Sequence, residues 1–466
     1  MKLASTQTET QFQAQERGNC INISENTTMK KYIPLLICII AIITAIILRI
    51  ILPWGTIFQE NITIFQGVDA YYYLHLADII SSNNMQIPQF DAYYDFPNGL
   101  DYSQLPSTFN AYGWFIALLT WIFTWGQPTK SALDFIAALH PAILGILALI
   151  PIFFITRTIC KNNYVASGAM LLGSIIPGEY MGRAMLGATD THCLEIFLFS
   201  YIMMFTIFSL NDSRLKFLWI GLTSIFYASY LLIWQGAVIY GLFMSILGIM
   251  WLIWGKIQGK QNFSVATTIC VILALSTMLY LLVAGINVNY MYMLFVPILG
   301  LAIIFMYTVF TQKLKLWIYL SPLIIISLAL IGAIISLKFV GYNFYPQWFN
   351  GAINQVYNLV AWHTQSTTSE ELPLLVTLGT VSIDIPWIYF GLPWYLTFVG
   401  IGMLTYQWLK KNSMNIFFLL LWTLFMLLPE LAMRRFAYYF AINVIIVSAW
   451  AIWMLLKYFW GKSSAK

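Results

Sequence analysis

Long apolar runs separated by short polar segments make up most of this chain. A helix needs about 20 apolar residues to cross a bilayer, and thirteen runs reach or approach that length. They cover 32–53, 109–126, 134–156, 164–177, 193–210, 217–233, 237–255, 264–284, 290–310, 316–337, 386–408, 414–431 and 437–456. Run 164–177 is short and needs tilt or flanking polar residues to span. The pattern predicts an all-α, polytopic membrane protein with about 12–13 transmembrane helices.

Two long polar gaps, 54–108 and 338–385, interrupt the tight succession of runs. We expect both to be long loops outside the bilayer. Residues 1–29 are polar and rich in Gln, Thr, Asn and Glu, which predicts a flexible N-terminal tail. The multi-span membrane domain is then 30–460, and 461–466 forms a short cytoplasmic tail.

The composition supports a membrane protein and excludes two other classes. Of all residues, 60% are hydrophobic and 9% are charged, whereas soluble domains carry about 25% charged residues. So few charges do not cover the surface of a soluble globular protein, so that class is excluded. Intrinsic disorder is also excluded, because it requires low hydrophobicity. The five cysteines form no CxxC pair, so neither a disulfide framework nor a zinc site is expected. No basic block is dense enough to indicate nucleic-acid binding.

The few basic residues indicate the orientation of the chain. Lys30 and Lys31 precede the first run, and gap 54–108 contains six acids and no Lys or Arg. By the positive-inside rule the N-terminus is cytoplasmic and this gap is external. If run 109–126 does not fully cross, nearly every basic loop residue falls on the cytoplasmic side. We therefore expect 109–126 to lie on or dip into the outer face. The same parity puts three further segments outside, namely 177–192, 338–385 and 434–435.

The stretch between the fourth and fifth runs carries the densest charged chemistry. It contains Arg183, Asp190 and His192, and Glu195 follows at the start of the fifth run. Charged groups at a membrane boundary are costly and usually functional. Asp190 and His192 are two residues apart, so both side chains reach one ion from an extended segment. A carboxylate with an imidazole suits Mn²⁺ or Mg²⁺. The alternative is that they cap the helix that starts near Thr191, and spacing alone does not decide between the two.

Five further residues each have an ordinary explanation when taken alone. Asp69, within GVDAYYYL, is explained as a solvated acid beside interfacial tyrosines, and Glu370, within TTSEELP, as part of a polar loop. Trp234 suits an interfacial aromatic belt. Arg434 and Arg435 suit snorkelling anchors. Two adjacent Arg on the outer face, however, run against the positive-inside trend and favour pairing with an anionic group.

Taken together and in this order, the motifs resemble the catalytic subunit of oligosaccharyltransferase over essentially the whole chain. GVDAYYYL around Asp69 is similar to the family's first catalytic aspartate motif, and GRAMLGATDTH around Asp190 to its second acidic motif. TTSEELP around Glu370 is similar to the motif of the external loop that closes over the acceptor. RFAYY, which starts at Arg435, and a Trp-x-Gly position at Trp234 also match.

The resemblance implies a GT-C-type glycosyltransferase membrane domain. The implied reaction transfers an oligosaccharide from a polyprenyl (dolichyl-type) phosphate or pyrophosphate carrier to Asn in Asn-x-Ser/Thr. The implied partners are a lipid-linked oligosaccharide, an acceptor polypeptide and the lipid bilayer. We expect a multi-pass protein of the cell membrane with its active site on the external face.

The resemblance also assigns roles to individual residues. Asp69 and Glu370 would be catalytic, and Asp69, Asp190 and His192 would hold Mn²⁺ or Mg²⁺. The remaining implied residues are Arg183 and Trp234 for the lipid-linked phosphate, and Arg435 with Glu370 for the acceptor peptide.

One departure from the family and two other functions stay open. The family continues with a further span and a soluble external domain that carries a Trp-Trp-Asp motif. This chain has no adjacent Trp pair and stops at Lys466, so we expect that domain to be absent and a separate protein to be a candidate for supplying it. A membrane glycosyltransferase with a lipid or other acceptor explains Asp69 equally well but does not require TTSEELP or RFAYY. The second alternative is a membrane transporter, which needs ionisable residues at mid-membrane and often has an internal repeat. We see no convincing repeat in this sequence, and its acids cluster in the predicted outer loops.

Overall fold

The computed structural model describes residues 32–60, 62–102, 107–259, 263–285, 299–300, 372–377 and 380–463, together with positions 302–304, 306, 315 and 370. The described strands form three two-stranded hairpins, and most of the other described residues are helical. The predicted tail 1–29 lies outside the described residues, as do most of runs 290–310 and 316–337 and most of gap 338–385.

The helices begin with Tyr32–Ile57, which includes the π-helical turn η1 (Ile47–Ile51) and the short α2 (Trp54–Ile57). The next are α3 (Asp69–Ser82), α4 (Ser107–Phe123), α5 (Lys130–Leu147), α6 (Leu149–Cys160), α7 (Asn163–Ile175), α8 (Glu179–Gly182), α9 (Thr191–Asn211), α10 (Lys216–Ile233), η3 (Gln235–Ala237), α11 (Val238–Ile257) and α12 (Phe263–Ala284). The C-terminal set is α16 (Asp384–Phe390), α17 (Leu392–Lys411), α18 (Met414–Ala432), η7 (Arg434–Phe436) and α19 (Ala437–Ser463). The antiparallel hairpins pair β1 (Phe58–Gln59) with β2 (Ile62–Thr63), β3 (Phe90–Asp91) with β4 (Leu100–Asp101), and β5 (Val376–Thr377) with β6 (Thr380–Val381).

Eight described helical segments are long and apolar enough to cross a membrane, and the bent pair α16–α17 raises this to nine. The prediction of an all-helical, polytopic membrane protein is confirmed. Run 109–126 forms only a shorter apolar helix, described from Ala111 to Phe123. That length suits the expectation that this run does not fully cross the bilayer.

One predicted span differs from the structure. Run 386–408 is not continuous, because Gly391, at a φ of +60°, separates α16 from α17 and the two helices meet at 91°. Glycine adopts a positive φ at little cost, so one residue permits the bend. Run 164–177 is short, as predicted, and forms α7, whose 13 residues extend only about 20 Å. The helix stops before Ile176 because the residue preceding Pro177 disfavours helical geometry.

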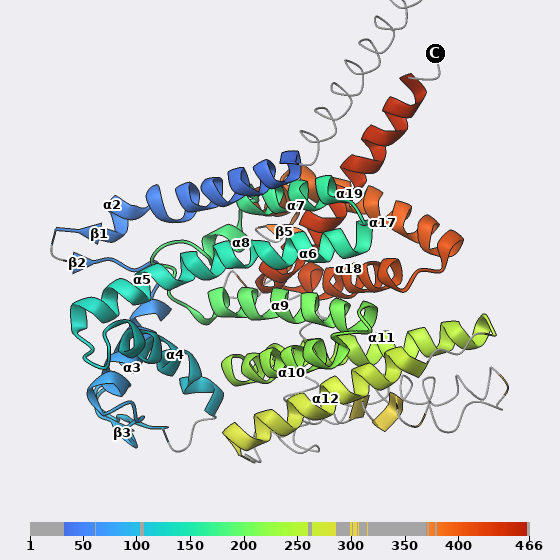
Figure 1. The fold of residues 1–466 in the computed structure, drawn as a ribbon. Coiled ribbons are helices and arrows are strands. Elements are labelled where there is room, and N and C mark those ends of the chain that lie inside the picture. The colour runs from blue at the N-terminus through green and yellow to red at the C-terminus, as the bar shows by residue number, and fades with distance from the viewer. Residues whose placement is uncertain are drawn as a thin grey trace, which may run out of the picture.

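Helix α9 lies in the middle of the bundle, between α10 on one side and α5 and α6 on the other (Figure 1). In the most apolar stretch of α9, 78% of the residues are buried inside the protein, so little of this helix is left to face lipid. The elements of the predicted external gap, including α2, α3 and β3, gather at the end of the bundle where α9 begins (Figure 1). The start of α9 therefore lies beside the elements of the predicted external gap.

The predicted external gap 54–108 is a structured region and not an irregular loop. Asp91 of β3 is buried and lies 2.6 Å from His75 Nε2 on α3, and it also accepts from the Tyr93 N–H (2.9 Å) and the Tyr102 hydroxyl (3.2 Å). Burial alone raises the pKa of Asp91, but the hydrogen bonds from His75 and Tyr93 outweigh it, and the pKa lies below its ordinary value. These contacts brace the β3–β4 hairpin against α3.

Arg49 is a fully buried cation in the first span. Its guanidinium donates to the carbonyls of Ser174 (2.9 Å) and Gly173 (3.3 Å), at the end of α7. Carbonyls of a last helical turn lack helical partners and carry the negative end of the helix dipole. The Arg49 carbonyl in turn accepts the Leu186 N–H (2.9 Å). Arg49 therefore ties both ends of the segment between α7 and α9 to the first span.

Candidate active site

The segment between α7 and α9 is held in place through its backbone. Gly178, at a φ of +73°, approaches α16 so closely that a Cβ would lie 2.5 Å from Tyr389 Cα. Gly187, at a φ of +80°, donates its N–H to the Ala138 carbonyl of α5 (2.8 Å). Glycine meets both demands, a positive φ and a close approach. The segment thus turns sharply around the short helix α8 before it enters α9.

Arg183 lies at the centre of an acidic cluster. Its Nε donates to Glu179 Oε2 (2.7 Å) and its Nη1 lies 3.5 Å from Asp190 Oδ2. Its Nη2 donates to Glu370, which comes from the second polar gap. Burial alone lowers the pKa of Arg183, but the Glu179 and Asp190 carboxylates more than reverse this, and the pKa lies above its ordinary value. Three of the predicted site residues, Arg183, Asp190 and Glu370, are thus brought together.

Asp190 caps α9 and also lies beside His192. Its Oδ1 accepts the Thr191 N–H (2.6 Å), as the capping alternative predicted. Its Oδ2 lies 3.3 Å from His192 Nε2. The two interpretations are compatible because the two carboxylate oxygens have different neighbours.

The donor chemistry of this pair fits a divalent cation. Carboxylate and imidazole together suit Mn²⁺, and three carboxylates around the single Arg183 leave an excess of negative charge. Within the described part of the chain, however, no group of three or more His, Cys, Asp or Glu is placed to hold a metal. Asp190 and His192 are adjacent, and Asp69 as their third ligand stays a prediction.

Asp69 is the first residue of α3, and its side chain is exposed. The preceding turn is tied to the segment before α9, because the Gln66 N–H donates to the Gly187 carbonyl (2.9 Å). Tyr73 lies four residues after Asp69 and so on the same face of α3, and it is hydrogen-bonded to Thr191. The structure thus attaches the start of α3 to the start of α9, without placing Asp69 in the Arg183 cluster.

Trp234 and Arg435 form a second group of predicted site residues. The Arg435 guanidinium carbon lies 5.6 Å from the Trp234 ring centroid, which is a cation–π distance. Tyr439 stacks on the same indole, with centroids 5.5 Å apart and an interplanar angle of 24°. Trp234 directly follows α10, and Arg435 lies in η7, so the ends of two spans meet here.

Arg434 has a different role from its neighbour Arg435. Its N–H donates to the Leu372 carbonyl (3.0 Å) and its Nε to the Pro373 carbonyl (3.3 Å). One residue further on, the Leu374 N–H donates to the Leu431 carbonyl (3.3 Å). These bonds fasten the segment that follows Glu370 to the junction of α18 and η7. Arg434 therefore helps to hold the Glu370 segment beside the cluster.

Glu195 is the functional candidate that sequence reasoning left without a role. It lies in the second turn of α9 with an exposed fraction of 0%. Tyr438 and Tyr439 of α19 both donate their hydroxyls to it, at 2.8 and 2.5 Å. The sequence feature that could have indicated this contact is the pair of tyrosines in RFAYY. Hydropathy alone, however, does not distinguish tyrosines that face the protein interior from those of an interfacial aromatic belt.

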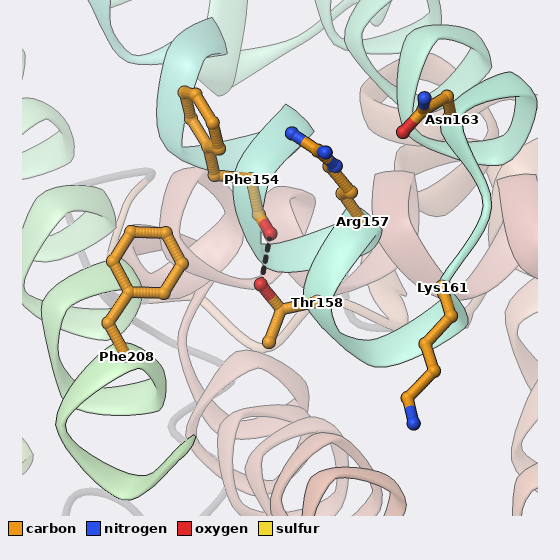
Figure 2. Close-up of a pocket in the computed structure, with 6 residues that line it drawn as sticks. All are labelled: Phe154, Arg157, Thr158, Lys161, Asn163 and Phe208. Atoms are coloured by element: carbon orange, nitrogen blue, oxygen red, sulfur yellow. Dashed lines mark hydrogen bonds between the residues drawn. The ribbon is translucent and has the colours of Figure 1, made fainter. Parts of the chain in front are cut away.

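A pocket of about 520 Å³ lies far from this site, along α6 and the end of α9, and is lined by Phe154, Arg157, Thr158, Lys161, Asn163 and Phe208 (Figure 2). Phe208 follows Asp190 by 18 residues, or about 27 Å of helix. Arg157 and Lys161 extend in opposite directions, and the hydrogen bond shown joins Thr158 to the Phe154 carbonyl of its own helix (2.8 Å) (Figure 2). Because its polar groups do not converge, we do not consider this pocket an active site.

The fold and the site together define a class of protein. The chain is a polytopic helical membrane protein in which acidic and basic side chains converge where one buried central helix begins. The family model described as "Oligosaccharyl transferase STT3, N-terminal" matches residues 39–460. The chain therefore belongs to this family, and the resemblance carried by the motifs is confirmed.

Curated relatives agree with this assignment. Dolichyl-phosphooligosaccharide-protein glycotransferase 3 of Archaeoglobus fulgidus is 26% identical over 453 residues, which cover 91% of this chain and 50% of the relative. Dolichyl-monophosphooligosaccharide-protein glycotransferase AglB of Haloferax volcanii is 24% identical over 173 residues, covering 37% of this chain and 16% of the relative. The chain thus spans about half the length of the first of these relatives.

Solved structures show the same fold. The archaeal oligosaccharyltransferase AglB from Archaeoglobus fulgidus, in complex with an inhibitory peptide and a dolichol-phosphate, superposes with a TM-score of 0.75 at 22% identity. The match covers 94% of this chain and 52% of that one. An Archaeoglobus fulgidus oligosaccharyltransferase in complex with Zn and sulfate gives a TM-score of 0.66 at 19% identity and covers 91% and 49% of the two chains. The membrane domain described above therefore has the fold of the archaeal enzymes.

Proposed function

We propose that this chain transfers an oligosaccharide from a polyprenyl (dolichyl-type) phosphate or pyrophosphate carrier to Asn in Asn-x-Ser/Thr. The observation that supports this most is the meeting of Arg183, Asp190 and Glu370 beside His192 at the start of α9. Family membership and the relatives' names as dolichyl-linked glycan transferases favour the same reaction. We assign the protein to the plasma membrane, with a cytoplasmic N-terminus and the site on the external face.

The acceptor side of the reaction needs carboxylates. An Asn amide is a weak nucleophile because its lone pair is delocalised into the carbonyl. In our proposal Asp69 and Glu370 accept hydrogen bonds from the two amide hydrogens, which orients the nitrogen towards C1 of the first sugar. The new N–C1 bond forms as the bond from C1 to the phosphate oxygen breaks, and a carboxylate takes the released amide proton.

The donor side needs positive charge at the leaving phosphate. Arg183 carries five N–H donors, and three of them face Glu179, Asp190 and Glu370. The remaining N–H groups are available to a phosphate oxygen, and the acids keep the guanidinium oriented. Asp69, Asp190 and His192 would hold Mn²⁺ or Mg²⁺, which acts as a Lewis acid towards that phosphate. A relative solved with dolichol-phosphate and another solved with Zn and sulfate support such a site.

The group of Trp234 and Arg435 would bind the two substrates beside the reacting atoms. In our proposal the Trp234 indole lies against the lipid-linked phosphate, and Arg435 contacts the acceptor peptide. The cation–π contact between them would then join the donor and acceptor sites. A separate protein that carries a soluble acceptor-reading domain is a proposed partner.

Reconstitution tests the proposed function. Proteoliposomes with this chain, Mn²⁺ and a lipid-linked oligosaccharide should glycosylate an Asn-x-Thr peptide but not its Gln-x-Thr counterpart. The assay is run with and without the soluble domain of an archaeal relative. Transfer of the sugar to a lipid would support the alternative glycosyltransferase, and lack of any transfer under both conditions would contradict the proposal.

A further inference from the structure

Glu195 is a carboxylate buried inside a membrane span. An ionisable group in such a position is costly and is retained for a function or for a specific partner. Glu195 begins the second turn of α9, three residues after His192, so the two side chains lie on one face of the helix. Neither the family's motifs described above nor the proposed reaction uses it.

Both oxygens of Glu195 have close neighbours. Oε1 accepts from the Thr191 hydroxyl (2.7 Å) and lies 3.3 Å from His192 Nδ1. Oε2 accepts from the Tyr438 hydroxyl (2.8 Å) and the Tyr439 hydroxyl (2.5 Å). A carboxylate offers about four lone-pair sites, and four polar neighbours surround this one. The group is therefore a fully satisfied hub between α9 and α19.

The imidazole of His192 lies between two carboxylates. Its Nδ1 faces Glu195 Oε1, and its Nε2 lies 3.3 Å from Asp190 Oδ2. A neutral imidazole carries its proton on one nitrogen and a lone pair on the other. A carboxylate next to one nitrogen retains the proton there, fixes the ring and makes the other nitrogen a better metal ligand.

We propose that Glu195 is a positioning residue that holds the proton on His192 Nδ1 and so presents Nε2, beside Asp190, to a divalent cation. The inference rests on the metal site of the proposed function. Tyr438 reinforces the arrangement, because its hydroxyl also lies 3.1 Å from His192 Nδ1 and its ring centroid 5.1 Å from the imidazole.

The same hub reaches the second group of site residues. Tyr439, bonded to Glu195, accepts a hydrogen bond from the Tyr230 hydroxyl (2.5 Å) and stacks on Trp234. Trp234 in turn carries Arg435 on its ring. A continuous set of contacts thus runs from the His192 pair to the proposed acceptor-binding residues, and Glu195 is its central member.

Metal binding by the full chain in nanodiscs tests the proposal. Mn²⁺ affinity is measured by EPR titration, and an electron spin-echo experiment detects the imidazole nitrogen through its coupling to Mn²⁺. We expect E195Q to weaken Mn²⁺ binding roughly 10- to 100-fold, as loss of an outer-shell partner does, and to diminish the nitrogen signal. Y438F should weaken binding by a smaller factor in the same direction, and it carries the test if E195Q does not fold.

Glu430 provides a matched control. It is a second fully buried Glu in a span, and its carboxylate has no hydrogen-bond partner among the described residues. E430Q should keep both the affinity and the nitrogen signal of the unsubstituted protein.

Three results would overturn the inference: no Mn²⁺ binding by the unsubstituted chain, unchanged binding in folded E195Q, or equal losses in E195Q and E430Q. Binding that depends on Glu195 in a protein that transfers no glycan would leave the inference standing and contradict only the proposed function.

Discussion

At the scale of single residues, one guanidinium organises the candidate site. Arg183 faces three carboxylates that come from α8, from the cap of α9 and from the second polar gap. Like charges this close repel one another unless a cation lies between them. Arg183 therefore holds the acids together, and in our proposal it has a second task, which is to present its remaining N–H groups to a phosphate.

Substitution of Arg183 separates these tasks. R183Q removes the charge and should lower the rate of glycan transfer by about 10²- to 10³-fold, the usual cost of a lost electrostatic stabiliser. R183K keeps the charge but not the planar fork, so its rate should lie between the two. Initial rates in the reconstituted assay measure the effect. Equal rates in R183Q and the unsubstituted protein would contradict the assigned role, and K161Q, in the pocket of Figure 2, is the control.

The two adjacent arginines should give different defects. R435A removes the cation from the Trp234 ring, and a cation–π contact of ordinary strength predicts a roughly 3- to 30-fold higher KM for the acceptor peptide. R434A removes the side-chain bond to the Pro373 carbonyl, so it should lower kcat and expose the segment after Glu370 to protease. Peptide kinetics and limited proteolysis check both effects. Identical defects in the two variants would exclude this division of roles.

At the scale of elements, short segments are fixed by a few buried contacts. Arg49 secures the two ends of the α7–α9 segment, and Asp91 secures the β3–β4 hairpin against α3. Both residues are charged, and the side chain of each bonds to other parts of this chain and not to a substrate. A charged residue in an apolar or aromatic stretch is thus not by itself evidence of catalysis, and its hydrogen-bond partners decide the question.

The hairpin contact should make stability depend on pH. The pKa of Asp91 lies below its ordinary value of 3.8 in the folded protein. Its contribution to the free energy of unfolding is therefore complete well above pH 3.8 and is lost as the pH falls through the lower folded pKa. We expect D91N to lower Tm at pH 7, and the gap to the unsubstituted protein to narrow below about pH 4. Thermal scans across this range provide the measurement, and a gap that widens in acid would contradict it.

At the scale of the whole molecule, charge placement predicts the orientation in the membrane. Ser82 ends α3 in the predicted external gap, whereas Asn163 begins α7 two residues after Lys161, which we assign to the cytoplasmic side. In a variant without its natural cysteines, S82C should react with an impermeant maleimide in intact cells. N163C should react only after permeabilisation. The reverse pattern would invert the orientation that we propose.

The sequence predicted the class and most of the described spans, because hydropathy and charge are local properties, whereas the roles of the site residues stay predictions. It did not predict the break at Gly391, because an isolated glycine within an apolar run does not by itself show that the helix ends there. It also gave no role to Glu195, because the two tyrosine hydroxyls that donate to this residue come from α19, more than 240 residues away. Asp69 marks the opposite case, in which the motif is recognisable while its ligand role stays a prediction.

The first span is connected through Arg49 to the segment that carries Arg183. It has 26 residues, and the other described residues bury only 17% of its most apolar stretch, so we expect most of its length to face lipid. At about 1.5 Å per residue it is near 39 Å long, which exceeds a hydrocarbon core of about 30 Å and requires tilt. Because Arg49 fastens this helix to the segment that carries Arg183, we expect a change of helix tilt in a thicker or thinner bilayer to move that segment. The thickness of the host membrane is thus predicted to affect the activity that we propose.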